Sequence, residues 1–482
     1  MSAVPVRRAP VRPAAPSRDR TAPRGLGPPA AILTLAPALL VLAAHLWATT
    51  DPQAMIHASL LIAAIGMVHG MALFVVLGGD RISLPGYFQV GSAVIVGASG
   101  LLVAPDPYFL EVPQPDRWVH AALFAATSAQ IGIGALSLRT DPPAPAPPAL
   151  LPDAAALRAQ LAGTLLLAGS LVLGVRLGPF LDGFGFAAIL LVCVAALLSR
   201  KGLRSPLNVV LVLAGLAAYP VLVISGTGRL RAIALALAVG YLAFLRYGRR
   251  WMKTLGVLAA PVILAALGLW RREYEEAMTG QHGNDTGLSS MFVAIGNLGS
   301  LIHDSEHGLA PTLGTSLLSP LGAALPDALR PAWIPEATGY ELAAFTDPEL
   351  YGTGFSTVAS VYGDLWWNLG LLGLVAGTPV LALLLGRIDA EAVRALQRAD
   401  GAPHRLLLAV LLLALLGGVG DLVWSGFHTW IVRMYARAAA LPLLGLGMLL
   451  LPVRSTPTFV SLAAVSPADD LRPAAAPRRA ER

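Results

Sequence analysis

PLNVVLVLAGLAAYPVLVISGTGRLRAIALALAVGYLAFLRYGRRWMK, residues 206–253, indicates the fold class of the whole chain. Its two apolar runs, 206–224 and 229–247, are each close to the roughly 20 residues that a helix needs to cross a bilayer. A Ser-Gly-Thr-Gly turn separates the runs, and four basic residues lie at or just after the end of the second one: Arg246, Arg249, Arg250 and Lys253. Basic residues gather at the cytoplasmic ends of spanning helices. The stretch therefore predicts two helices that cross a membrane.

Similar apolar runs recur along most of the chain. Of its 482 residues, 56% are hydrophobic and only 13% are charged, whereas a soluble domain carries about 25% charged residues. We expect an all-α, polytopic integral membrane protein of about twelve transmembrane helices. They are placed at 29–49, 56–78, 86–104, 117–138, 157–176, 180–198, 206–224, 229–247, 252–270, 357–386, 404–424 and 430–452.

The distribution of charge predicts the orientation. If alternate loops are cytoplasmic, most of the 34 Lys and Arg residues lie inside, with both termini in the cytoplasm. Residues 1–28 and 453–482 are rich in Ala, Pro and Arg, and we expect disordered tails there. Because the basic residues follow the membrane boundaries and form no single patch, nucleic-acid binding is excluded. The only cysteine, Cys193, lies in an apolar run, so there is no disulfide framework.

One large loop, 271–356, is expected outside the membrane, after nine helices (29–270) and before three more (357–452). It holds three arginines against eleven acidic residues. Connections of this length are usually functional or disordered. Its short apolar stretches, Met291–Ile302 and Leu317–Leu329, suggest helices that lie on the membrane surface or fold back over a cavity.

Two arginine pairs near the outer boundary are candidate anion sites. Arg229 and Arg231 begin a helix after the Ser-Gly-Thr-Gly turn, where exposed N–H groups and the helix dipole favour an anion. The alternative is that they extend to lipid headgroups. Arg433 and Arg437 are one turn apart near the outer end of the last helix, where a buried charge needs a polar cavity or a partner. Asp421 is the alternative, structural partner.

Two further patterns could carry chemistry. Asp364 begins the tenth helix within Tyr-Gly-Asp-Leu-Trp-Trp-Asn, and a carboxylate there suits a general base. Pairing with an arginine is the alternative. His303-Asp304-Ser305-Glu306-His307 matches H-x-x-E-H, a zinc-protease motif, but Gly308 follows at once and no protease domain surrounds it. We therefore predict structural or hydrogen-bonding roles for these histidines and no metal site.

From Gly314 to Gly386 the chain resembles the O-antigen polymerases of the Wzy type, which join oligosaccharide repeat units. The family's G-x-S-x-L, i-P…p, G-x-S and E-x-Y-x-N-x-G segments correspond to 314–318, 325–331, 354–356 and 364–370. Ser225 to Arg229 is similar to its S-G-S-R segment. The sequence departs from these motifs with Asp at 364, Trp at 366 and Thr plus an extra Gly at 227–228.

The resemblance implies a GT-C-like fold in the bacterial cytoplasmic (inner) membrane. It implies polymerisation on the outer face, where a glycan linked by diphosphate to undecaprenol is transferred to an incoming lipid-linked repeat. Asp364 would be the base, and Arg229, Arg231, Arg433 and Arg437 would bind the diphosphate. Ser356 and Asn368 are motif positions expected to contact substrate. No cofactor is implied, and the implied partners are the lipid-linked oligosaccharide, membrane lipids, a chain-length regulator and a flippase.

Three alternatives remain open. An O-antigen ligase shares substrate and fold, but a His-Asn pair at the helix after the loop would favour it, and Trp367-Asn368 lacks the histidine. A mannosyltransferase-like enzyme usually has paired acids in its first outside loop, where this chain has only Asp51. A transporter or flippase would be indicated by internal repeats, which we do not find.

Overall fold

Helices dominate the computed structural model, which describes residues 28–259, 289–346 and 357–452 apart from short gaps and isolated positions. Within the described residues there is no strand, only an isolated bridge between Leu151 and Ser199. Both expected tails, part of the expected helix at 252–270 and the start of the expected loop lie outside the described residues; 252–259 are described and helical. The prediction of an all-α membrane protein is confirmed.

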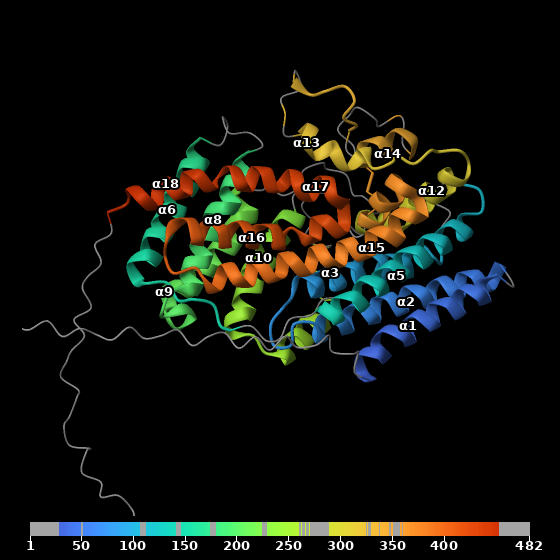
Figure 1. Ribbon diagram of the computed structural model, residues 1–482, viewed down its shortest axis with the longest axis horizontal. Coiled ribbons are helices and arrows are strands. Elements are labelled where there is room, and N and C mark those ends of the chain that lie inside the picture. Colours follow the sequence, from blue (N-terminus) through green and yellow to red (C-terminus); the bar gives the residue numbers. More distant parts are fainter. Residues whose placement is uncertain are drawn as a thin grey trace, which may run out of the picture.

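The first part of the chain forms long helices and several short helical pieces. They are α1 (Pro28–Ala48), α2 (Pro52–Val76), α3 (Leu84–Ser92), η1 (Ala93–Ala98), α4 (Ser99–Val103), α5 (Pro115–Thr140), α6 (Asp153–Val172), α8 (Phe180–Leu198), η3 (Gly202–Arg204), α9 (Pro206–Ala218), η4 (Tyr219–Val223) and α10 (Arg229–Tyr247). Helices α1, α2 and α5 lie side by side (Figure 1). The ranges of α8 and α10 are those expected from the sequence.

The second part begins with what we call the loop segment, the described part of the expected outside loop (residues 289–346). It contains α12 (Ser289–Glu306), η5 (Thr315–Leu318), α13 (Ser319–Ala323) and α14 (Thr338–Thr346). It is followed by α15 (Ser360–Gln397), α16 (Pro403–Gly417), α17 (Val419–Ala439) and α18 (Leu441–Leu450). In Figure 1, α12, α13 and α14 lie together beside the start of α15.

Eight helices of the described chain are long and apolar enough to cross a membrane, and α8, α9 and α16 contribute shorter apolar helices. Large apolar side chains such as Leu35 and Leu39 on α1 are exposed on the surface of the fold. Lipid tails can cover such side chains at no cost, whereas the backbone must be paired internally, which helices achieve.

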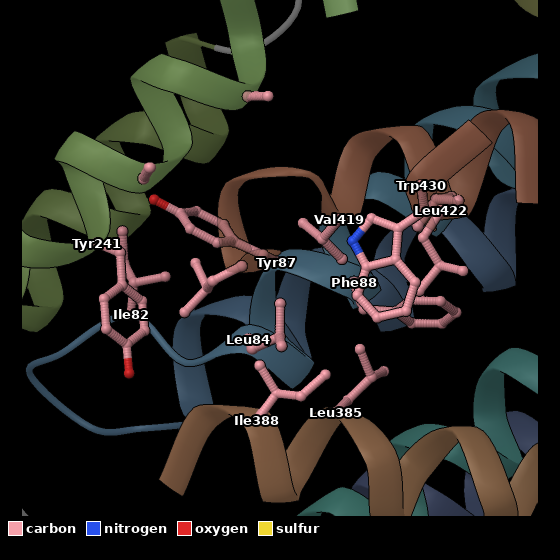
Figure 2. Close-up of a cluster of buried hydrophobic side chains, with 14 of the residues drawn as sticks. Ile82, Leu84, Tyr87, Phe88, Tyr241, Leu385, Ile388, Val419, Leu422 and Trp430 are labelled. Carbon is pink, nitrogen blue, oxygen red and sulfur yellow. The ribbon is translucent and has the colours of Figure 1, made fainter. Parts of the chain in front are cut away.

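Helix α3 is buried in the centre of the fold, where other helices surround it. Figure 2 shows Leu84, Tyr87 and Phe88 of α3 among side chains of α10, α15 and α17. Tyr87 donates a hydrogen bond to the Leu237 carbonyl (3.1 Å), and Ser92 and Tyr362 share one at 2.8 Å. The start of α15, which carries Asp364, is thereby fixed to the core.

The predicted end of the tenth helix at 386 is wrong, because α15 continues to Gln397. The added stretch is polar but forms a good helix: Glu391 pairs with Arg387 at 3.5 Å and with Arg394 at 3.1 Å, one turn away in each direction. Part of the expected cytoplasmic loop is therefore helix.

Two helices are interrupted by glycines with left-handed backbone. Gly370 interrupts α15 (φ 60°) and Gly426 interrupts α17 (φ 79°, ψ −167°). In a straight helix Asp421 and Arg433 would be about 18 Å apart along the axis, yet they form an ion pair. The chain therefore turns back at Gly426. The loop expected at 425–429 corresponds to this break. After it, the Trp430 indole N–H donates a hydrogen bond to the Leu415 carbonyl of α16 at 3.0 Å.

Candidate functional site

Asp364 lies at the break in α17. Its side chain is 3% exposed, and its Oδ2 atom accepts a hydrogen bond from the Phe427 N–H at 2.7 Å. Phe427 is the first residue after Gly426, so the carboxylate caps the second half of α17, where the free N–H groups and the dipole favour an anion. A Cβ atom at Gly426 would lie 1.9 Å from Oδ2. The close approach of backbone and carboxylate therefore requires glycine.

The loop segment covers this end of α15 through hydrogen bonds. The Asn368 Oδ1 atom accepts from the Ser316 hydroxyl at 2.9 Å and from the Thr312 hydroxyl at 3.2 Å. The Thr338 hydroxyl bonds to Ser316 at 3.3 Å and also hydrogen-bonds with Asp364. Asn368 donates to the Asp364 carbonyl at 2.7 Å. Buried polar groups are thus paired across three separate stretches of sequence.

Two tryptophans after Asp364 add hydrogen bonds that hold the loop segment against α15. Trp366 donates its indole N–H to the Ser305 hydroxyl at the end of α12 (3.1 Å), and Trp367 donates to Glu341 of α14 (3.1 Å). Burial raises the pKa of the Glu341 carboxyl above its ordinary value. Access to Asp364 therefore requires that the loop segment move.

His428 is a residue of this site that the sequence reasoning missed. Its Nδ1 atom lies 2.7 Å from the hydroxyl of Ser319, which is buried in α13. It directly follows Phe427, so it adjoins the Asp364 cap, and the positive charge of Arg330 acts on its ring. The only signal for His428 in the sequence is its position in an apolar stretch, two residues after Gly426.

Three of the four predicted arginines, Arg231, Arg433 and Arg437, lie in a separate cluster of charges. Asp421, which is fully buried, pairs with Arg433 and, at 3.6 Å, with Arg437. Arg231 pairs with Asp182 of α8 at 3.1 Å, and Asp182 also accepts from the Tyr219 hydroxyl. The guanidinium of Arg437 stacks over Phe186 at 4.1 Å. Among the residues that the structure describes, three arginines therefore face two aspartates in this cluster, an excess of one positive charge.

The sequence-predicted residues thus come together in part. Asp364 and Asn368 meet, and Arg231, Arg433 and Arg437 share one cluster. Asp421 is the partner of Arg437 that was named as the alternative, and no ion pair between Asp364 and an arginine occurs among the described residues. Arg433 is six residues beyond Phe427, about 9 Å along the helix. Ser356, the Ser225–Gly228 turn and the Arg229 side chain lie outside what the structure describes.

The histidines of the H-x-x-E-H motif pack as aromatic residues. The rings of His303 and His307 stack with centroids 4.1 Å apart, and both meet the edge or face of Trp118. His303 Nδ1 contacts Asp304 at 2.9 Å, and His307 Nδ1 contacts the His303 carbonyl at 2.7 Å. These contacts fit the structural role predicted for the motif.

No family model, curated protein or solved structure matches the chain. The chemistry of the site therefore has to be argued from its geometry. A buried carboxylate, a histidine with a hydroxyl partner and a net-positive arginine cluster lie along one bent helix, α17, and its neighbours. Such an arrangement can accept a proton and hold an anion.

Proposed function

We propose that the chain is a polymerase that joins undecaprenyl-diphosphate-linked oligosaccharide repeat units on the outer face of a bacterial cytoplasmic membrane. The observation that carries the proposal is the hydrogen bond between Ser316 and Asn368. These residues belong to two motif segments of the resemblance, 52 positions apart, and they meet beside Asp364. A shared site gives a physical reason for both segments to be present.

In the proposed reaction, Asp364 acts as the general base. The acceptor sugar's hydroxyl transfers its proton to the carboxylate, its oxygen bonds to the anomeric carbon of the growing glycan, and the bond from that carbon to the diphosphate oxygen breaks. Undecaprenyl diphosphate leaves with the negative charge. Because Asp364 is 3% exposed, the acceptor reaches it only after the loop segment moves away from α15.

The departing diphosphate is stabilised by arginines. Arg231, Arg433 and Arg437 carry one charge more than their two aspartate partners, and Arg229 adds another formal charge at the start of α10. A fixed cationic cluster lowers the energy of a developing anion without reorganisation. The proposed roles of Ser356 and Asn368 are contacts to the sugars.

The proposal includes the finer topology. Twelve spanning helices in a GT-C-like arrangement, with both termini in the cytoplasm and the loop segment outside, place Asp364, Asp182, Arg231 and Arg433 near the outer ends of their helices. Lipid-linked oligosaccharide is then the substrate, and a flippase and a chain-length regulator are the partners. The reaction needs no cofactor.

A second candidate is the ligase that transfers the same lipid-linked glycan to a different acceptor. His428, brought next to the Asp364 cap from another helix, is the observation that favours it. Deletion of the gene separates the two. Loss of long glycan ladders with single repeat units still attached supports the polymerase, loss of all attached glycan supports the ligase, and unchanged glycan excludes both.

A further inference from the structure

An exposed row of large apolar side chains runs along the loop segment at intervals of four residues. We call it the apolar row: Leu313, Leu317, Leu321, Leu325, Leu329 and Trp333. Each of these side chains is between 40% and 75% exposed. Large exposed apolar side chains that gather on one polar segment indicate a site that binds protein, lipid or ligand.

The opposite side of the same stretch contacts the candidate site. Ser316, Ser319 and Gly322 alternate with the first leucines of the row and are buried. Ser316 bonds to Asn368, and Ser319 lies 2.7 Å from His428. The stretch is therefore amphipathic, with a polar side toward Asp364 and an apolar side that no described residue covers.

One basic residue, Arg330, lies within the apolar row. Arg330 is the only Lys or Arg between residues 273 and 356. Its side chain lies against α13, where a Cβ atom at Gly322 would be 3.1 Å from the Arg330 Nε atom, and its Nη2 donates to the Pro335 carbonyl at 2.9 Å. A positive charge is thus placed within the apolar row and against α13, whose Ser319 contacts His428.

We propose that the apolar row binds the isoprenoid tail of a lipid diphosphate, with Arg330 contacting the diphosphate. An apolar row with one cation beside it complements an anionic amphiphile. The candidate site next to the row indicates that this amphiphile is the substrate lipid, because only a substrate must bring its diphosphate headgroup to Asp364. This inference rests on the proposed function and adds a binding surface that the arginine cluster does not supply. Bulk phospholipid against the row is the competing occupant.

The test uses the full-length protein in nanodiscs of zwitterionic lipid. Cys193 is buried, so Leu321→Cys gives a single accessible thiol for a polarity-sensitive fluorophore. Tyr340→Cys, an exposed position of α14 outside the row, is the matched control. Each labelled protein is titrated with undecaprenyl diphosphate, undecaprenol and phosphatidylglycerol, with and without Arg330→Gln.

We expect a saturable shift to an apolar signal at position 321 with undecaprenyl diphosphate and none at position 340. Arg330→Gln should weaken that binding by roughly tenfold, the loss expected for one charge-assisted contact. No response at position 321, an equal response at position 340, or the same response to phosphatidylglycerol would each overturn the inference. If gene deletion still removes glycan ladders in that case, the proposed function survives without this docking surface.

Discussion

The Asp364 carboxylate and the Phe427 backbone N–H, 63 residues apart, are joined by a 2.7 Å hydrogen bond across the break in α17. One residue thus has two possible roles, as the cap of a helix fragment and as a proton acceptor. Asn in place of Asp separates them, since an amide oxygen still accepts the N–H but no longer takes a proton at neutral pH.

Gly426→Ala should destabilise the protein strongly. The positive-φ, extended-ψ backbone of Gly426 is essentially restricted to glycine and costs another residue about 1–3 kcal/mol. The added Cβ would also overlap Asp364, which forces the cap apart. Gly420→Ala in the same helix is the control, since nothing lies within 4 Å of its Cβ. Thermal unfolding in detergent should show a large loss of Tm for Gly426→Ala only. Equal Tm values for the two variants would contradict the described geometry.

Asp421→Asn should cost about 3–5 kcal/mol of unfolding free energy, because it leaves the buried Arg437 and the partly buried Arg433 with one fewer counter-charge. Asp400→Asn, which breaks the exposed pair with Arg405, should cost less than about 1 kcal/mol. Denaturant or thermal unfolding compares the two. A small effect of Asp421→Asn would mean that the arginines have another anion, such as bound lipid phosphate.

Acidification should stabilise the folded state through the buried carboxyl of Glu341. Burial raises the pKa of Glu341 above its ordinary 4.5, so the folded state binds a proton more readily than the unfolded state. The extra stability is fully present below pH 4.5 and is lost as pH rises through the raised pKa. The Tm gain on acidification should therefore be smaller in Glu341→Gln than in the wild type. An identical dependence of Tm on pH in both proteins would contradict this prediction.

Topology reporters test the orientation. A reporter fused near Gln281 or Glu336 should read as outside the membrane, and one near Arg398 as inside. Reporter activity with the sides reversed would place Asp364 at the cytoplasmic face and remove the proposed mechanism, since the lipid-linked glycan would then be on the wrong side.

The sequence predicted most helices because apolar runs of bilayer length leave few alternatives; α8 and α10 begin and end where expected. It failed at the end of α15, where polar residues with ion pairs one turn apart continue a helix beyond the apolar run. The pairing of Asp421 with Arg437 was anticipated as an alternative, because a buried charge needs a partner.

The contacts of the site could not be predicted in the same way. The approach of Asp364 to Phe427 depends on a left-handed conformation at Gly426, and glycine in an apolar helix has no single meaning. The packing of α8 near α10 gives Asp182 its partner Arg231, and the packing of α13 against α17 gives His428 its partner Ser319. Periodicity identifies which residues are buried, but not which buried residues meet.

The central claim is that Asp364 is the base of a glycan polymerase, and chain length in a complemented deletion strain tests it most directly. Asp364→Asn should abolish long glycan ladders at normal protein level and Tm, because the cap is retained and the proton acceptor is lost. Arg437→Lys should shorten the ladders partly, since the charge remains without the bidentate fork, and Arg437→Ala should shorten them further. Normal ladders from Asp364→Asn would contradict the catalytic role and leave Asp364 as a helix cap alone.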